Sequence, residues 1–166
     1  MPIASAIEAI VDAVPITVQC PWLRARQPSI SANCSSPIRP VGTVGKAAVF
    51  FVSWTSPGTG TAPLWRTDGT RPGTFPIAGG ASEGPQPCGS SSSERSPALI
   101  GGILFFPGHD SEGCELWRTD GTAAGTRRVT DIQPRTDFIQ DLTAWNGALW
   151  FGVRSPGEAG LWRSDG

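Results

Sequence analysis

The sequence contains a single histidine, His109. The next two residues, Asp110 and Ser111, carry the carboxyl and hydroxyl groups that nucleophilic catalysis uses. His109, Asp110 and Ser111 are therefore the set from which a Ser-His-Asp triad could be assembled. A triad is defined by its geometry, and consecutive side chains on one loop rarely align for proton transfer. A solvated turn histidine is the favoured interpretation of His109, and the sequence predicts no catalytic residue.

The same stretch places several oxygen ligands on one short loop. Asp110, Ser111 and Glu112 precede Gly113, and such groups can coordinate Ca²⁺. Their spacing differs from that of a recognised calcium loop, so a polar hairpin loop is the favoured interpretation. We expect no cofactor and keep His109, Asp110 and Glu112, with Ca²⁺ as the ligand, as the alternative site.

Four cysteines are the remaining reactive side chains: Cys20, Cys34, Cys88 and Cys114. The sequence has no Cys-x-x-Cys pair and only one histidine, which argues against a zinc site. Pairing that closes the local loops gives Cys20–Cys34 with Cys88–Cys114, and would imply an oxidising compartment. Free, buried cysteines are the alternative, and no evident signal peptide supports export.

A hexapeptide that occurs three times defines the organisation of the chain. Leu64-Trp-Arg-Thr-Asp-Gly69 returns unchanged at residues 116–121 and returns with Ser for Thr at residues 161–166. A residue set present in every copy is expected to build the repeat rather than to catalyse, and periods near 45 residues are typical of propeller blades. The proposed structural set is the Trp, Asp and Gly of each copy: Trp65, Asp68, Gly69, Trp117, Asp120, Gly121, Trp162, Asp165 and Gly166.

The residues around the hexapeptide predict strands and hairpin turns. An apolar doublet precedes each copy, as Phe50-Phe51, Phe105-Phe106 and Trp150-Phe151, and we infer a three-residue insertion in the first copy. In the third copy we expect strands at 138–145 and 148–153 with Asn146-Gly147 as a type I′ turn. A loop at 155–159 and a strand beginning at Leu161 should follow. In the second copy, residues 126–132 should form a fourth strand.

These elements predict an all-β fold of antiparallel four-stranded meanders, stacked as a partial β-propeller of about three blades. Apolar runs on both faces of the strands favour such stacking, because each sheet then has a neighbour on either side. The expected divisions are an N-terminal segment (1–35), repeat 1 (36–83), a flexible loop (84–97), repeat 2 (98–137) and a truncated repeat 3 (138–166).

The third copy is expected to lack its last strand. We therefore expect a fragment of a longer chain, or a sheet completed from elsewhere by residues 16–19 or by self-association. The N-terminal segment has helical apolar spacing over residues 3–14, which predicts a short helix, and a strand over residues 16–18.

The second copy and its flanks carry a family resemblance. The stretch Glu115 to Thr126 (ELWRTDGTAAGT) resembles the signature of bacterial ELWxxDGT, or hyalin-like, repeat proteins, and the resemblance covers about residues 36–166. Pro63 and Gly160 replace the leading Glu in the other two copies. The resemblance implies a β-propeller fold and an extracellular or cell-envelope location, but no biochemical activity.

Composition narrows the function classes. The formal net charge is −1 and no basic stripe occurs, so nucleic-acid binding is not expected. No apolar run approaches the length of a membrane span. Repetition without a concentrated catalytic set predicts a non-enzymatic scaffold for a protein or glycan partner. The alternative is a propeller-based hydrolase or lyase with active residues in non-repeat loops or in missing sequence.

Overall fold

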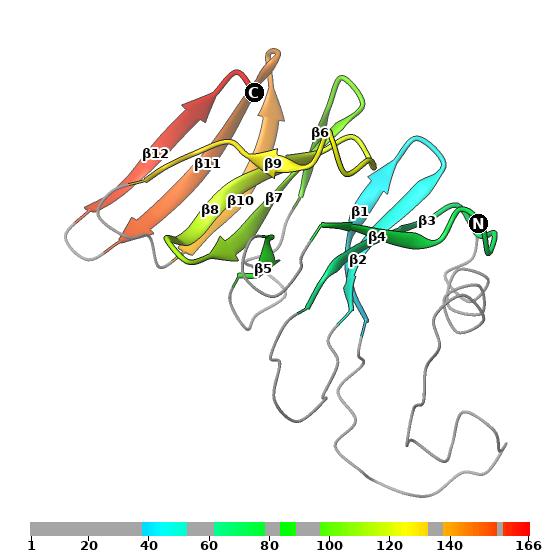
Figure 1. Cartoon of the computed structure of the whole chain (residues 1–166). Helices are drawn as coiled ribbons and strands as arrows, with labels where there is room; N and C mark the ends of the chain where they lie inside the picture. The colour runs from blue at the N-terminus through cyan, green and yellow to red at the C-terminus, as the bar shows by residue number, and fades with distance from the viewer. Residues whose placement is uncertain (1–37, 53–61, 79–83, 89–96, 133–137, 156–157) are drawn as a thin grey trace, which may run out of the picture.

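The computed structural model describes residues 38–52, 62–78, 84–88, 97–132, 138–155 and 158–166. These residues form antiparallel sheets of three to five strands and contain no helix, which confirms the all-β prediction (Figure 1). No sheet of the described part closes on itself. The predicted N-terminal helix and strand, together with Cys20 and Cys34, lie outside the described residues.

Repeat 1 forms a four-stranded meander in the order β1-β2-β3-β4. Its strands are β1 (Ile38–Val44), β2 (Ala47–Val52), β3 (Leu64–Thr67) and β4 (Phe75–Ala78). The alternation of β2 is weak, because five of its six residues are buried. A strand has this burial pattern when both faces of its sheet are covered.

Repeat 2 forms a sheet with one strand more than expected. The meander contains β6 (Ala98–Ile100), β7 (Ile103–Asp110), β8 (Gly113–Thr119) and β9 (Arg127–Arg128). A further strand, β5 (Gln86–Pro87), pairs with the end of β7 through Gln86 and His109. Part of the stretch expected as a flexible loop (84–97) is thus an ordered strand, and Gly84, Pro85 and Cys88 beside it are buried.

The predicted fourth strand of repeat 2, residues 126–132, was too long. Only Arg127 and Arg128 pair with β8. Beyond them the buried carboxylate of Glu115 accepts hydrogen bonds from Thr130 Oγ1 (2.6 Å) and from the backbone N–H of Ile132 (3.2 Å). The Glu115 side chain therefore supplies hydrogen bonds that pairing with β8 would supply in a longer strand, and β9 ends at Arg128.

Repeat 3 forms a three-stranded sheet of β10 (Phe138–Trp145), β11 (Ala148–Ser155) and β12 (Glu158–Ser164). Strand β10 has the predicted bounds, and Asn146 and Gly147 have φ of 50° and 72°, as a type I′ turn requires. The predicted loop at 155–159 was too long. Ser155 and Glu158 are opposite each other in the ladder, and β12 begins three residues before Leu161.

The register corrects the alignment of the apolar doublets. The residue opposite the repeated Trp is Phe50 in repeat 1, Phe106 in repeat 2 and Phe151 in repeat 3. From Phe50 to Trp65 is 15 residues, whereas the other two separations are 11 residues, so the insertion in repeat 1 has four residues rather than three. The error arose because sequence similarity alone matched Phe51 to Phe106.

Two buried clusters join the three sheets. One cluster contains Phe51 and Leu64 of repeat 1 with Phe106 and Trp117 of repeat 2, and the Phe51 and Phe106 rings meet edge to face at 6.1 Å. The other cluster contains Leu116 of repeat 2 with Leu149, Phe151 and Val153 of repeat 3. The Leu of the repeated motif therefore packs against the following repeat, while Trp117 packs against the preceding one.

Replacing Phe106 with Ala tests whether the first two sheets are one cooperative unit. The Phe106 side chain is 1% exposed between them, so we expect a loss of about 3–5 kcal/mol in the free energy of unfolding. Chemical denaturation measures the loss, with Leu99→Ala as the control because Leu99 is 51% exposed. Equal effects of the two substitutions would contradict this packing.

Candidate functional site

The repeated Thr-Asp-Gly-Thr turn is a directed chain of hydrogen bonds. In repeat 2, the Gly121 N–H donates to Thr119 Oγ1 (3.0 Å), and Thr126 Oγ1 donates to the Thr122 carbonyl (2.6 Å). The two hydroxyls are 2.7 Å apart. Because the Thr126 hydroxyl hydrogen is already committed, Thr119 must be the donor between them. The chain thus runs from a backbone N–H through two hydroxyls to a backbone carbonyl.

The carboxylate of the turn is held by the same threonines. Asp120 Oδ1 accepts from the Thr122 N–H (2.9 Å) and from Thr122 Oγ1 (2.7 Å), while Thr122 Oγ1 accepts from the Gly125 N–H (3.0 Å). A Cβ on Gly125 would lie 2.0 Å from Asp120 Oδ1. Gly125 is therefore required because the carboxylate occupies the space that a side chain would fill.

Repeat 1 reproduces this arrangement closely. Its hydroxyl pair is separated by 2.6 Å, and its Asp68 Oδ1 accepts from Thr70 at 2.9 and 2.7 Å. A Cβ on Gly73 would again lie 2.0 Å from the carboxylate. In repeat 3 the bond that is present joins the Gly166 N–H to Ser164 Oγ (3.2 Å). The Thr-to-Ser change keeps the first bond of the chain.

The threonines of the turn were not among the predicted structural residues, although they anchor it. The missed set is Thr67, Thr70, Thr74, Thr119, Thr122 and Thr126. Two of them, Thr67 and Thr119, are almost fully buried at 2% and 0% exposure. The signal that could have found them is their recurrence at the same offsets from Asp-Gly in both complete copies.

The arginine that follows the motif Trp has an aromatic neighbour in repeat 1. In repeat 1 the Arg66 guanidinium lies 5.2 Å from the centre of the Phe75 ring. It is also 3.9 Å from the carboxylate of Asp68, although both side chains are partly exposed. A partly exposed pair contributes little to stability. The stacking on Phe75 is the better account of this position.

The pKa values of the turn aspartates and of Glu115 are shifted in opposite directions. The side-chain hydrogen bond from Thr122 lowers the pKa of Asp120, and Thr70 does the same to Asp68. Glu115 is 0% exposed, and burial raises its pKa despite the hydrogen bonds from Thr130 and Ile132. The turn carboxylates are therefore stabilised as anions, whereas the interior of the sheet favours the protonated form of Glu115.

The structure does not assemble His109 and Asp110 into a triad. His109 is exposed in β7, and Asp110 directs Oδ1 to the Glu112 N–H (2.8 Å) and Oδ2 to Arg128 (3.4 Å). The first bond lies within the turn between β7 and β8, and the second joins this turn to β9. Within the described ranges, no group of three or more His, Cys, Asp or Glu side chains is placed to hold a metal ion.

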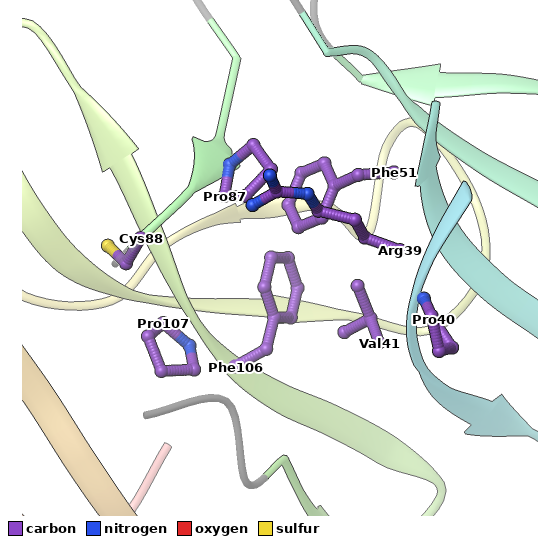
Figure 2. Close-up of a pocket in the computed structure, with 8 residues that line it drawn as sticks. All are labelled: Arg39, Pro40, Val41, Phe51, Pro87, Cys88, Phe106 and Pro107. Carbon is purple, nitrogen blue, oxygen red and sulfur yellow. The ribbon is translucent and has the colours of Figure 1, made fainter. Parts of the chain in front are cut away.

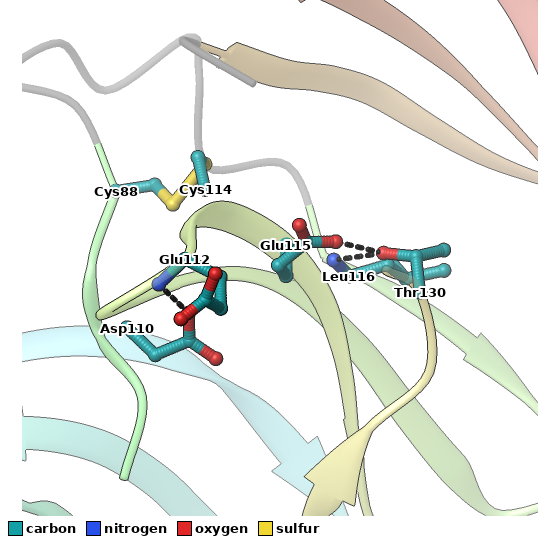
Figure 3. The surroundings of a disulfide bond; sticks show 7 residues. All are labelled: Cys88, Asp110, Glu112, Cys114, Glu115, Leu116 and Thr130. Atoms are coloured by element: carbon teal, nitrogen blue, oxygen red, sulfur yellow. Dashed lines mark hydrogen bonds between the residues drawn. A yellow bond between two sulfur atoms is a disulfide. The ribbon is translucent and has the colours of Figure 1, made fainter. Parts of the chain in front are cut away.

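Cys88 and Cys114 are joined by a disulfide, with their Cα atoms 5.8 Å apart (Figure 3). Both residues are buried, at 4% and 2% exposure. The bond fixes the segment after β5 to the start of β8, close to the hydrogen-bonded pair of Glu115 and Thr130. It closes a loop of 26 residues, and in chain-entropy terms such a cross-link contributes about 3 kcal/mol.

A hollow lies between repeats 1 and 2 (Figure 2). Its walls are chiefly apolar, with three prolines and the charged side chain of Arg39 at its border. The lining residues are Arg39, Pro40, Val41, Phe51, Pro87, Cys88, Phe106 and Pro107. Phe51 and Phe106 also belong to the buried cluster between these sheets, so the hollow is a boundary of the core rather than a set of reactive groups.

Comparisons with protein-family models, curated proteins and solved structures gave no match to this chain. The described residues contain no helix long and apolar enough to cross a membrane.

Thr119→Val tests the hydroxyl chain. Valine has nearly the same shape but leaves the Gly121 N–H and Thr126 Oγ1 without their partner, so we expect a loss of about 1–3 kcal/mol in unfolding free energy. Thr119→Ser is the matched control, because repeat 3 carries Ser164 at this position. Denaturant titration should rank wild type, then Ser, then Val; a Val variant as stable as the Ser variant would exclude a role for the hydroxyl.

Acid stability should depend on Asp68 and Asp120. Their lowered pKa values mean that they stabilise the fold above the ordinary value of 3.8, and that this contribution disappears as pH falls through the lowered pKa. The Asp68→Asn/Asp120→Asn variant should therefore be less stable than wild type near pH 6, and the difference should shrink below about pH 4. Melting temperatures between pH 2 and 6 measure it.

Glu115 is present in both proteins, so its opposite contribution cancels in this comparison. For a carboxyl group with a raised pKa, the stabilising contribution is present below the ordinary value of 4.5 and is lost as pH rises through the raised pKa. A difference between the two proteins that stayed constant across the whole pH range would contradict the role given to the aspartates.

Proposed function

We propose that the protein is a non-enzymatic repeat scaffold of β-propeller type, whose loops bind a protein or glycan partner. The observation that carries the proposal is that the repeated polar residues are used within the turns. Thr119, Asp120 and Thr122 bond to one another and to the backbone, and repeat 1 uses its equivalents in the same way. Because these residues are used to shape the repeat, partner recognition falls to the loops that differ between copies.

The resemblance to ELWxxDGT repeat proteins supports the same proposal. The motif residues have the turn and packing roles that a stacked repeat needs, because Leu64 and Trp117 meet in one buried cluster between adjacent repeats. We propose that the sheets are successive blades of a propeller. The buried disulfide between Cys88 and Cys114 supports an extracellular or cell-envelope location, since disulfides persist in oxidising compartments.

Binding and turnover can be separated in one set of measurements. The 166-residue chain would be applied to a glycan array and to immobilised envelope proteins, and in parallel to a panel of glycan and ester substrates. We expect binding to one of the two ligand classes and no turnover. His109→Ala should leave both results unchanged, because His109 is exposed and Asp110 is bonded to Glu112 and Arg128 instead.

Turnover of a glycan or an ester that is lost in His109→Ala would overturn the scaffold proposal in favour of a hydrolase or lyase. Glu112→Gln serves as the control for the hairpin, because it removes a charge from the same exposed loop without touching the histidine. Retained turnover in both variants would place the activity elsewhere in the chain, and would overturn the proposal equally.

A further inference from the structure

Two arginines lie directly opposite each other at the border of the repeat 2 sheet. Arg118 of β8 pairs with Arg127 of β9, the border strand of that sheet (Figure 1). Residues opposite each other in an antiparallel ladder project from the same face, with their Cβ atoms about 4.5–5.5 Å apart, and like charges in such a pair are destabilising. An anion between the two guanidinium groups would replace this repulsion with two attractions.

Neither arginine has an anionic partner within the described residues. The ion pairs in this part of the chain involve other arginines, and no side-chain hydrogen bond reaches Arg118 or Arg127. Asp120, two residues after Arg118, directs Oδ1 to Thr122 instead. The Arg118 Nε–H is buried without an acceptor, and Arg127 is exposed. Both groups are therefore available to an acidic ligand.

Repeat 1 fills the position of Arg127 in a different way. Phe75 lies opposite Arg66 there, and the Arg66 guanidinium is 5.2 Å from the centre of the Phe75 ring. Arg66 is also 3.9 Å from the carboxylate of Asp68, although its Nε–H is buried without an acceptor as in repeat 2. Repeat 2 thus has a second positive charge where repeat 1 has an aromatic ring. Partner recognition was assigned above to features that differ between the copies, and this pair is one of them.

The position of Arg127 is open to solvent on one side and bounded by the core on the other. Phe75, its equivalent in repeat 1, is 40% exposed although the complete sheet of repeat 2 follows it. This outer position is therefore exposed even where the next repeat covers the rest of the face. On the inner side, Phe105 lies opposite Arg118 and is 3% exposed in the cluster shared with repeat 3. An anion beside this apolar wall is attracted more strongly than one in open water.

The surroundings of the pair favour a glycan over a protein as the source of the anion. A protein interface usually has an apolar core with charged groups at its rim. The large apolar side chains that are exposed in the described part of the chain lie in β4, β6, β10 and β12, and none lies in β7, β8 or β9. Polar surface around two positive charges suits a hydroxyl-rich ligand that carries acidic groups.

We propose that Arg118 and Arg127 together bind a carboxylate or sulfate group of an acidic glycan. Each guanidinium presents a planar fork of N–H donors that matches such an oxyanion. The assignment rests on the proposed scaffold function and names the chemistry of the ligand that repeat 2 takes. Repeat 1 does not form the site, because Phe75 stands in place of the second guanidinium.

Exchanging the residue that differs between the repeats tests the site. Arg127→Phe gives repeat 2 the pairing that repeat 1 has at Arg66 and Phe75, so the fold should be retained. Isothermal titration with an oligouronate, a sulfated oligosaccharide and a neutral oligosaccharide of equal length measures binding. Wild type should bind an acidic ligand and not the neutral one, and Arg127→Phe should weaken this binding by about tenfold or more. Arg127→Lys keeps the charge without the fork and should lie between them.

Arg71→Gln is the control for net charge, because Arg71 is an exposed arginine in the turn of repeat 1. It should leave the affinity unchanged, and circular dichroism of every variant should match wild type. Equal losses in Arg71→Gln and Arg127→Phe, an Arg127→Phe variant that binds as tightly as wild type, or tighter binding of a polyglutamate peptide would overturn the site and leave the scaffold function standing. A wild type that binds neither acidic oligosaccharide would overturn the site as well. The scaffold function itself fails only if the glycan array and the envelope proteins also show no binding.

Discussion

The structure depends on the burial of sheet faces between neighbouring repeats, and the sheet of repeat 2 is covered in this way on both faces. Adjacent residues of a strand point to opposite faces, so the Leu-Trp pair of the motif serves two interfaces at once. Leu116 lies in the cluster shared with repeat 3, and Trp117 lies in the cluster shared with repeat 1. A lone meander of this size would be marginal in water. The hydrogen-bonded turns, the disulfide and the register all operate within this shared burial.

The turns determine where each strand must end so that its motif residues face the right neighbour. A one-residue slip would exchange the faces of Leu116 and Trp117 and would remove both from their clusters. The hydroxyl chain from Gly121 to Thr122 fixes the bend after β8, and the close approach of Gly125 to Asp120 fixes the return. Two complete copies use the same bonds, so the same turn geometry is built twice.

Much of the fold could be predicted from local sequence, because periodicity and turn chemistry act over a few residues. Strand β10 and the Asn146-Gly147 turn were predicted at their observed positions. The failures have a different cause. The short β9 results from the carboxylate of Glu115, which reaches Thr130 and Ile132 from 15 and 17 residues away. The sequence letters do not show where such a side chain will be buried. For the candidate site, the chemistry of Asp-Gly could be anticipated, but the hydroxyl pair becomes evident only when β8 and the returning chain are brought together.

The residue before the motif leucine has a different role in each of the three sheets. In repeat 1 the carbonyl of Pro63 accepts from the Val52 N–H, and the fourth strand extends to Ala78. In repeat 2 the Glu115 carboxylate accepts hydrogen bonds from Thr130 and Ile132, which follow β9. Gly160 in repeat 3 has no side chain with which to do this. The residue at this position therefore decides whether a carboxylate is present to bind the backbone that follows the turn, as it is in repeat 2.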